Sequence, residues 1–93
     1  MAERLTEEQV TKGLAALPGW SREGEEIRKQ FSFSDFLGSI AFVNEVAKLA
    51  EAANHHPDIT INYNKVILAM TSHDAGGLTQ QDLDLARQIE TRR

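Results

Sequence analysis

The sequence predicts an α+β fold in which three helices pack on one face of a four-stranded antiparallel sheet, in the order α-β-β-α-β-β-α. Apolar residues recur every three or four positions in three segments, which indicates amphipathic helices. Apolar and polar residues alternate in the segments between them, which indicates strands with one covered face. A chain of 93 residues has room for one modest core, so we expect a single domain over residues 1–93.

The first helix is expected to begin after Thr6, because this side chain can cap the backbone and Gln9 follows three residues later. Pro18-Gly19 should end the helix. The residues that would line its core face are Val10, Leu14 and Leu17.

Two strands are expected next, at residues 20–23 and 26–33, with Gly24 in the turn between them. In the second strand Ile27, Phe31 and Phe33 share one face with Lys29, and polar residues occupy the other face. This alternation predicts a strand that contacts the core on one side and water on the other.

Ser34 is the expected N-cap of the longest helix, with Asp35 in its first turn. The helix should run to about Asn54, because Asn tolerates the left-handed conformation that closes helices and Pro57 prevents continuation. The expected core-facing stripe is Phe36, Ile40, Val43, Ala47 and Ala50, widened by Leu37 and Leu49.

The next two strands form a predicted hairpin at residues 59–63 and 66–72, with its turn at Asn64-Lys65. The second strand is apolar on both faces, since Ile67 and Ala69 alternate with Val66, Leu68 and Met70. Both faces therefore need cover. Helices can cover one face, and we expect a second subunit on the other.

Gly76-Gly77 turns the chain into the last helix, where Thr79 and Asp82 have the spacing of a capping box. Its expected core residues are Leu83, Ala86 and either Ile89 or Glu90.

The composition limits the kinds of partner. The formal net charge is −4, so no overall basic field attracts nucleic acid. No apolar run approaches the roughly 20 residues that span a bilayer, and the first 17 residues lack the apolar core of a signal peptide. We therefore expect a cytoplasmic protein. The chain contains no cysteine, which excludes disulfides and thiolate zinc sites.

All three histidines lie in one stretch of the chain, from Glu51 to Asp74. His55 and His56 follow the long helix and His73 follows the last strand, so both ends can face one cleft. Imidazole titrates near about pH 6.5 and can both give and take a proton at neutral pH. The pattern favours a small acid/base site without metal.

Other interpretations of the histidines remain open. A histidine at a helix end can cap carbonyl groups or simply face water. A metal site could add Asp74 or Glu51 as oxygen ligands, although adjacent histidines diverge and the spacing matches no motif such as H-E-x-x-H. Ser72 next to His73 does not have the geometry of a triad. Asp82 has an equally good role as the acid of the capping box.

Two runs carry a family resemblance. They read N-H-H-P-D-I-x-I-x-Y-N-K-V from Asn54 and T-S-H-D-A-G-G-L-T-x-x-D-x-x-L-A from Thr71, with the spacing H-H-P-x5-Y-x9-H. These runs closely resemble the pterin-4a-carbinolamine dehydratases. The similarity extends upstream through Gly19-Trp20 and the Phe31-Ser32-Phe33 strand, and so covers nearly the whole chain.

The resemblance implies a fold and a reaction. The fold is a four-stranded antiparallel sheet with helices on one face. The reaction is loss of water from 4a-hydroxytetrahydrobiopterin or a similar pterin carbinolamine, which gives the quinonoid dihydropterin. That product is regenerated for aromatic amino acid hydroxylases. No metal or organic cofactor is expected.

The resemblance also implies roles for individual residues. His55 and His73 would exchange protons near the 4a hydroxyl, and His56 would mainly bind the substrate. The further residues expected at the substrate are Glu51, Asn54, Pro57, Tyr63, Ser72, Asp74 and Asp82.

A second hypothesis keeps the fold without the activity. Animal members of this family also act as dimerisation cofactors of a homeodomain transcription factor, so a protein-binding module is the alternative. The expected partners are a pterin and a second copy of the chain, as a homodimer or homotetramer, with no direct contact to nucleic acid or membrane.

Overall fold

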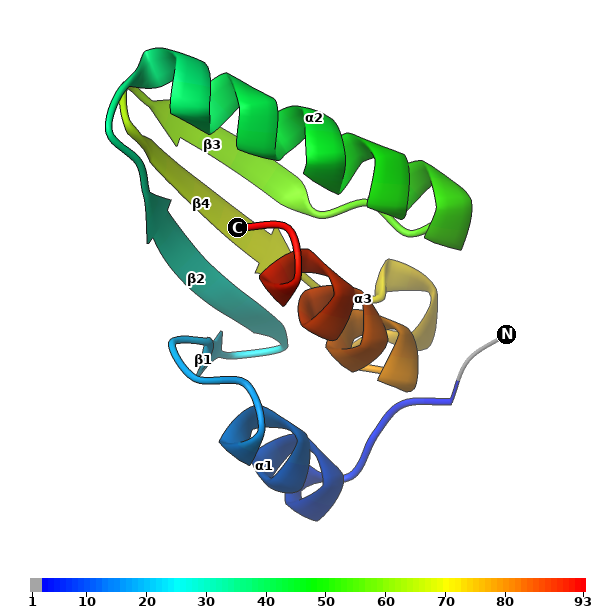
Figure 1. Cartoon of the computed structure of the whole chain (residues 1–93). Coiled ribbons are helices and arrows are strands. Elements are labelled where there is room, and N and C mark those ends of the chain that lie inside the picture. The colour runs from blue at the N-terminus through cyan, green and yellow to red at the C-terminus, as the bar shows by residue number, and fades with distance from the viewer. Residues whose placement is uncertain (1–2) are drawn as a thin grey trace.

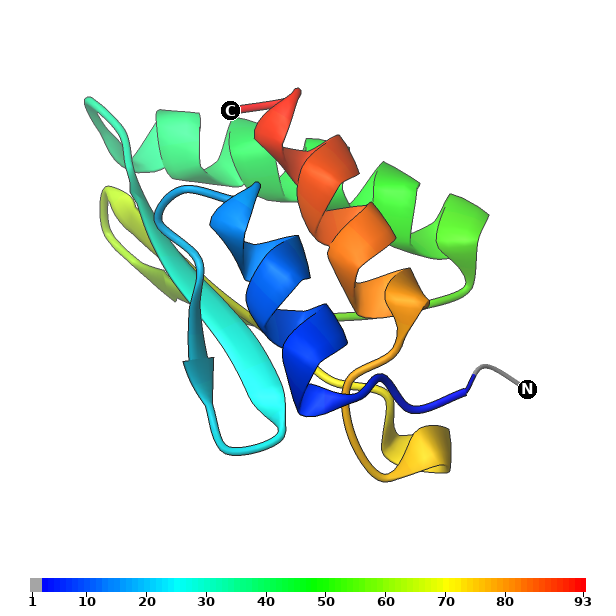
Figure 2. The same ribbon diagram turned by 90° about the horizontal axis from the view of Figure 1, so that it is seen from below.

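The computed structural model describes residues 3–93 and confirms the α+β class. The helices are α1 (Glu7–Ala15), α2 (Phe36–Ala53), a short 3₁₀ helix η1 (His73–Ala75) and α3 (Gln80–Glu90). The strands β1 (Ser21–Glu23), β2 (Glu26–Ser32), β3 (Asp58–Asn62) and β4 (Lys65–Met70) form an antiparallel sheet in the order β1-β2-β4-β3. The three α-helices lie on one face of this sheet (Figure 1, Figure 2).

Both predicted capping boxes are present. Thr6 Oγ1 accepts the Gln9 N–H at 3.2 Å, and Gln9 Oε1 accepts the Thr6 N–H at 2.8 Å. At the start of α3, Asp82 Oδ2 accepts the Thr79 N–H at 2.9 Å. These reciprocal bonds satisfy backbone donors that have no partner inside the helix, so each helix begins at a defined residue.

The start of α2 differs from the prediction. Asp35, rather than Ser34, is the N-cap, and its Oδ1 accepts the Gly38 N–H at 2.8 Å. The preceding chain stays tied to the sheet, because the Phe33 N–H donates to the Asn64 carbonyl oxygen at 2.8 Å. The helix therefore begins one residue later than expected.

The predicted core stripe of α2 is largely wrong. Ala50 is buried, but Ile40 and Val43 are half-buried and Phe36 and Ala47 are exposed. Leu37, expected to widen the stripe, is 74% exposed, whereas Leu49 packs against the core. The residues of α2 that are buried are Ser39, Phe42, Val46 and Ala50.

The buried stripe of α2 differs from the predicted one because it includes a polar residue. Apolar side chains occur on more than one face of α2, so helical spacing alone fits two stripes. Ser39 faces the core with no exposed surface, because its Oγ donates to the Tyr63 carbonyl oxygen at 2.7 Å. A satisfied hydroxyl can be buried at little cost, and the inner stripe therefore includes a residue that hydrophobicity alone leaves outside.

The predicted hairpin forms, but its turn is one residue earlier than expected. Asn62 pairs with Lys65, so Tyr63 and Asn64 make the two-residue turn. Tyr63 has a φ of 54°, in the left-handed region that such turns use. Strand β4 ends at Met70 rather than Ser72.

The helices cover one of the two apolar faces of β4. Val66, Leu68 and Met70 are fully buried beneath the helices. Ile67 and Ala69 are half-buried on the opposite face, where no helix packs (Figure 2).

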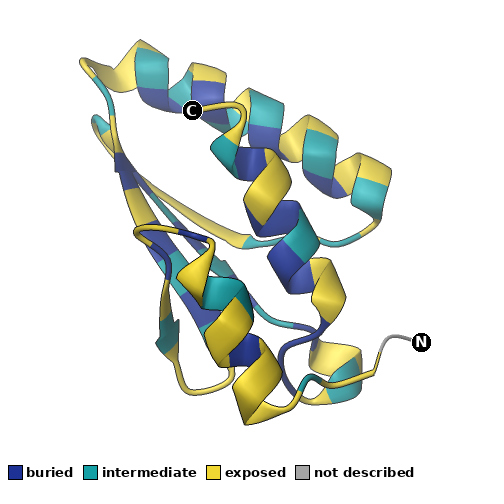
Figure 3. Cartoon of the chain, turned by 60° about the horizontal axis from the view of Figure 1, so that its bottom comes forward, coloured by how far each residue is buried: buried dark blue, intermediate teal, exposed yellow. Residues whose placement is uncertain are grey.

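The core fills the space between the sheet and the helices. Figure 3 shows the buried residues gathered on the inward surfaces of α2, α3 and the strands. Phe31 and Phe42 stack with ring centres 4.7 Å apart and tie β2 to α2. Within residues 3–93, no helix combines the length and apolar character needed to cross a membrane.

Candidate active site

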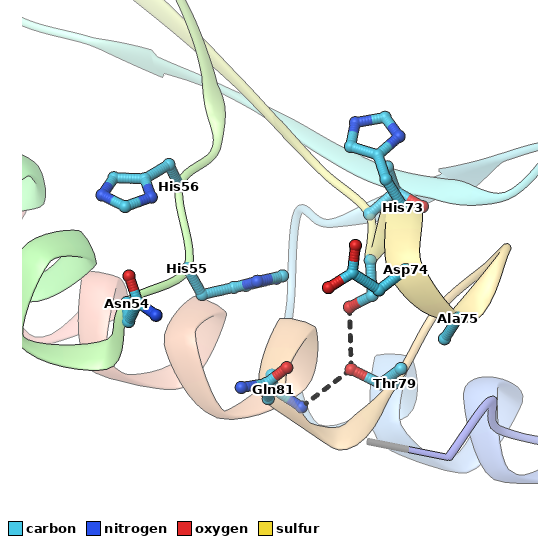
Figure 4. A pocket seen from close by; sticks show the side chains of 10 residues that line it. Asn54, His55, His56, His73, Asp74, Ala75, Thr79 and Gln81 are labelled. Carbon is cyan, nitrogen blue, oxygen red and sulfur yellow. Dashed lines mark hydrogen bonds between the residues drawn. The ribbon is translucent and has the colours of Figure 1, made fainter. Parts of the chain in front are cut away.

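One pocket of about 510 Å³ lies where the end of α2, η1 and the start of α3 meet. Figure 4 shows the His55 ring extending across it toward η1, which carries His73 and Asp74. The predicted site residues that line this pocket are Asn54, His55, His56, Ser72, His73 and Asp74. The two ends of the chain segment that holds all three histidines therefore meet at one cavity.

Asn54 places the first two histidines. It is the C-cap of α2, with φ 50° and ψ 43°, and its N–H bonds to the carbonyl oxygens of Ala50 and Glu51. This left-handed residue turns the chain out of the helix. His55 and His56 consequently occupy the short connection to β3 rather than a regular element.

His55 is held from behind by α3. Its Nε2 lies 2.6 Å from Asp82 Oδ1, and the His55 side chain is 12% exposed. Asp82 itself has no exposed surface. The carboxylate therefore orients the imidazole without lining the pocket.

Asp82 is the acid of the capping box, as the sequence suggests, and it also contacts His55. Its Oδ2 accepts the Thr79 N–H at 2.9 Å, which completes the helix cap, and also accepts the Ser72 hydroxyl at 2.9 Å. Its Oδ1 faces His55. A single buried side chain thus links the start of α3 to the turn after α2.

His56 has a different environment. Its Nε2 lies 2.5 Å from Glu51 Oε2, and the two side chains are 55% and 77% exposed. An exposed pair of this kind exchanges readily with water and contributes little to stability. It leaves the His56 ring at the rim of the pocket, where it can contact a ligand.

His73 begins η1 and is exposed to solvent. It lies on a ridge between the main pocket and a second hollow of about 440 Å³ that is lined partly by Glu23, Glu25 and Glu26. Gly76, with φ 73°, closes η1. The bridge between Ser72 and Gly77 fixes the base of this loop.

Four predicted site residues do not line the pocket: Glu51, Pro57, Tyr63 and Asp82. Pro57 is half-buried just before β3 and does not line the cavity. Tyr63 is 64% exposed in the hairpin turn at the far end of β3, and a five-residue strand spans about 17 Å. The fold of the single chain therefore does not bring Tyr63 to the histidines.

Four lining residues were not predicted as site residues: Thr71, Ala75, Thr79 and Gln81. The sequence signal for Thr79 is its position as the helix cap, which by itself indicates only a structural role. The N-terminal end of α3 forms one wall of the pocket, so cap residues of that helix become lining residues.

The arrangement has the groups that proton transfer needs. Imidazole and carboxylate groups surround a cavity of the size that holds small molecules. Among residues 3–93, no three His, Asp or Glu side chains are grouped closely enough to hold a metal ion. One imidazole is rigidly oriented by a buried carboxylate, and two others are accessible.

A sequence model of the family described as pterin 4 alpha carbinolamine dehydratase matches residues 3–92. The protein belongs to this family. The match includes every residue that lines the pocket, so the cavity lies within the region that the family shares.

Relatives of this dehydratase-family chain are similar in sequence along nearly its whole length. A protein from Roseiflexus sp. (strain RS-1), provisionally named pterin-4-alpha-carbinolamine dehydratase, is 57% identical over 97% of this chain and 97% of its own. A protein with the same provisional name from Thermosynechococcus vestitus is 52% identical over 96% of this chain and 94% of its own.

Solved structures of similar proteins carry several descriptions. The crystal structure of a transcriptional coactivator/pterin dehydratase from Brucella melitensis has a TM-score of 0.92 and 34% identity, over 96% of this chain and 97% of that one. A pterin dehydratase-like protein described as a RuBisCO assembly factor in the alpha-carboxysome has a TM-score of 0.67 and 21% identity, over 78% and 87%. The second similarity shows the fold alone.

Proposed function

We propose that the protein is a hydro-lyase that converts a pterin 4a-carbinolamine, such as 4a-hydroxytetrahydrobiopterin, to the quinonoid dihydropterin and water. The supporting observation is that His55 and His73, which follow different elements, line one pocket in a chain of this family. The product would enter tetrahydrobiopterin recycling for aromatic amino acid hydroxylases.

The reaction needs only proton transfer and positioning. The lone pair of ring nitrogen 5 forms a C=N bond to carbon 4a while the C–O bond breaks. The leaving oxygen takes one proton and nitrogen 5 loses one, so that water is released. No electrons leave or enter the substrate overall, and the proposal therefore requires no redox cofactor or metal.

The pocket supports a division of labour. His55 and His73 exchange protons with the ligand, because both line the cavity and imidazole works as acid or base near neutral pH. His56, with Glu51 behind it, binds the pterin ring at the rim. Asn54 and Asp74 provide further polar contacts along the wall.

The decay of a freshly prepared 4a-carbinolamine, followed with and without protein, tests the proposal. We expect wild type to accelerate the decay and His55→Ala to lose about 10²-fold or more of that acceleration, the usual contribution of a general acid or base. Gln88→Ala, an exposed change on α3 away from the pocket, is the matched control and should leave the rate unchanged. A decay rate with wild-type protein equal to the uncatalysed rate would reject the proposed dehydratase activity.

The pH dependence of the same assay tests the groups involved. The rate should change through the range in which imidazole titrates, near about pH 6.5. A profile that is flat from about pH 5 to 9 would rule out imidazole catalysis.

A second candidate function is protein binding. The Brucella melitensis structure is described as both a coactivator and a pterin dehydratase, so the same fold is compatible with a partner. In that case the pocket would be inactive, and the carbinolamine assay would show no difference between wild type and His55→Ala.

We also infer self-association. Strand β3 is an edge of the sheet, with every residue exposed, and unpaired edges readily bind another strand. The large apolar side chains exposed on the protomer are Phe36, Leu37, Ile59, Ile61 and Tyr63, in α2 and the β3 hairpin. Burying them against a second copy would give the expected homodimer or homotetramer.

A further inference from the structure

A buried chain of polar groups stands behind His55. Ser72, Thr79 and Asp82 are 7%, 0% and 0% exposed. Thr79 Oγ1 lies 2.8 Å from Ser72 Oγ, Ser72 Oγ lies 2.9 Å from Asp82 Oδ2, and Asp82 Oδ1 lies 2.6 Å from His55 Nε2. The chain therefore runs from the cap of α3 to the imidazole at the pocket.

The direction of every hydrogen bond in this chain can be worked out. A carboxylate only accepts, so the single hydroxyl proton of Ser72 goes to Asp82. With that proton used, the contact between Ser72 and Thr79 requires Thr79 to donate. Thr79 Oγ1 is free to do so, because it accepts the Gln81 N–H at 3.3 Å through a lone pair.

The donors to Asp82 also determine which atom carries the proton in the contact to His55. Asp82 Oδ2 already accepts from the Ser72 hydroxyl and from the Thr79 N–H, which can only donate. Two donors on one oxygen favour the ionised carboxylate. Its other oxygen is then an acceptor as well, and the proton between Asp82 and His55 belongs to Nε2.

We propose that the chain Thr79–Ser72–Asp82 holds His55 in the Nε2–H tautomer, so that Nδ1 is the nitrogen through which His55 exchanges protons with the bound ligand. Ser72 and Thr79 are positioning residues in this arrangement. The proposal deepens the dehydratase function and rests on it for the identity of the ligand. Within residues 3–93, Nδ1 has no protein partner, and no buried side-chain nitrogen lacks one, so Nδ1 is open to the pocket.

The tautomer gives His55 a defined part in the dehydration. In neutral His55 the Nδ1 lone pair accepts the proton that nitrogen 5 of the ring loses as the C4a–O bond breaks. His55 then carries protons on both nitrogens, and the Asp82 carboxylate balances its charge. The proton that converts the leaving hydroxide to water comes from a second group. His73, on η1 in the same pocket, fits that role.

No buried hydrogen-bonded chain among the described residues holds the His56 ring. Its partner Glu51 is an exposed side chain that accepts no other hydrogen bond from the described residues. A pair so open to water does not fix a tautomer through a buried chain, which separates the two adjacent histidines by role.

Ring-nitrogen NMR of ¹⁵N-histidine-labelled, ligand-free protein tests the proposal directly. His56→Gln and His73→Gln variants assign the signals. For the neutral imidazole of His55 we expect the Nε2–H tautomer. Asp82→Asn should reverse it to Nδ1–H, because the amide oxygen must accept from Thr79 and Ser72 and the amide NH₂ then faces Nε2. A wild-type His55 in the Nδ1–H form, or in a mixture of tautomers, would overturn the inference.

The positioning role of Ser72 has its own test. Ser72→Ala should lower kcat about tenfold, the effect of one lost hydrogen bond, and weaken the preference for the Nε2–H tautomer. Ser72→Thr, which keeps the hydroxyl, should restore both. A raised KM with unchanged kcat and tautomer would instead make Ser72 a ligand contact and contradict its positioning role.

The outcomes separate this inference from the proposed function. The tautomer is measured without substrate, so an inactive wild type with Nε2–H at His55 would reject only the dehydratase activity. An active wild type with Nδ1–H at His55 would reject only the tautomer inference.

Discussion

His55 Nε2 lies 2.6 Å from Asp82 Oδ1, although the two residues are 27 positions apart in the chain. Asp82 is also the residue whose other oxygen caps α3. The start of one helix and the turn after another are therefore joined by one carboxylate. Any change that moves the first turn of α3 also moves the imidazole, which couples the stability of this helix to the geometry of the pocket.

Asn54 should tolerate glycine but not valine. Its φ of 50° is in the left-handed region, which costs residues other than Gly and Asn about 1–2 kcal/mol. We expect Asn54→Val to lower the free energy of unfolding by about this amount, and more for the β-branched side chain. Urea denaturation measures it.

Asn54→Gly is the matched control and should unfold close to wild type. The carbinolamine rate should fall in Asn54→Val as well, because the same turn carries His55 and His56. Equal stability of the two variants would show that the left-handed turn carries no strain for valine.

The ion pair between Lys29 and Glu90 should contribute measurably to stability. Lys29 Nζ donates to Glu90 Oε2 at 2.8 Å and to the Pro18 carbonyl oxygen at 2.9 Å, and its side chain is 8% exposed. Lys29→Met leaves both acceptors without this donor. We expect a loss of about 1–3 kcal/mol in the free energy of unfolding, measured by denaturant titration.

Two further variants check this interpretation. Lys48→Met removes an exposed pair with Glu45 and should change stability by less than about 1 kcal/mol. Adding Glu90→Gln to Lys29→Met should recover part of the loss, because it removes a carboxylate that is left with only the Trp20 N–H and the more distant Arg93 guanidinium. If Lys29→Met behaves like Lys48→Met, the contact between Lys29 and Glu90 does not stabilise the fold.

The contact between Glu7 and Arg22 should contribute to stability at neutral pH but not in acid. Two hydrogen bonds at 2.9 Å and the positive charge of the Arg22 guanidinium hold the pKa of Glu7 below its usual value of 4.5. A carboxyl group with a depressed folded-state pKa stabilises the fold above its unfolded-state value. That stabilisation disappears as the pH falls through the folded-state pKa.

Urea midpoints of wild type and Glu7→Gln should therefore differ at pH 7 and converge as the pH is lowered below 4.5. Glu8→Gln is the comparison, since the Glu8 carboxylate lies 3.9 Å from Lys12 on the same helix. A difference that persists undiminished in acid would mean that Glu7 acts through something other than its charge.

The exposed apolar residues should mediate self-association. Light scattering of wild type should report a particle larger than the 10.4 kDa chain. Leu37→Glu places a charge on a side chain that is 74% exposed and should shift the particle toward 10.4 kDa, because burying an unpaired charge is costly.

Gln88→Glu adds the same charge on an exposed site of α3 and should leave the assembly intact. Wild type that measures 10.4 kDa at all concentrations would contradict self-association.

Local chemistry in the sequence was enough to predict much of the fold. Thr6 with Gln9 and Thr79 with Asp82 fix where two helices begin, because cap hydrogen bonds depend on residues three positions apart. Asn54 followed by Pro57 fixes the end of α2 in the same way. The alternation in β2 likewise predicted the face of that strand that contacts the core, where Ile27, Lys29 and Phe31 are buried.

Errors occurred where a remote partner decided the outcome. Ser39 is buried because a carbonyl oxygen in the hairpin turn accepts its hydroxyl. The turn itself begins at Tyr63 because the register of β3 on β4 pairs Asn62 with Lys65. Spacing along the chain contains no information about either partner.

The sequence by itself determined the three helices, the four strands and the concentration of histidines in one stretch, since each depends on neighbours within one or two turns. Only the tertiary structure decided that His55 and His73 share a pocket while Tyr63 lies outside it. It also decided that Asp82 contacts His55. These contacts join residues brought together by packing of α2, α3 and the sheet, and burial of their shared core fixes distances that sequence separation leaves free.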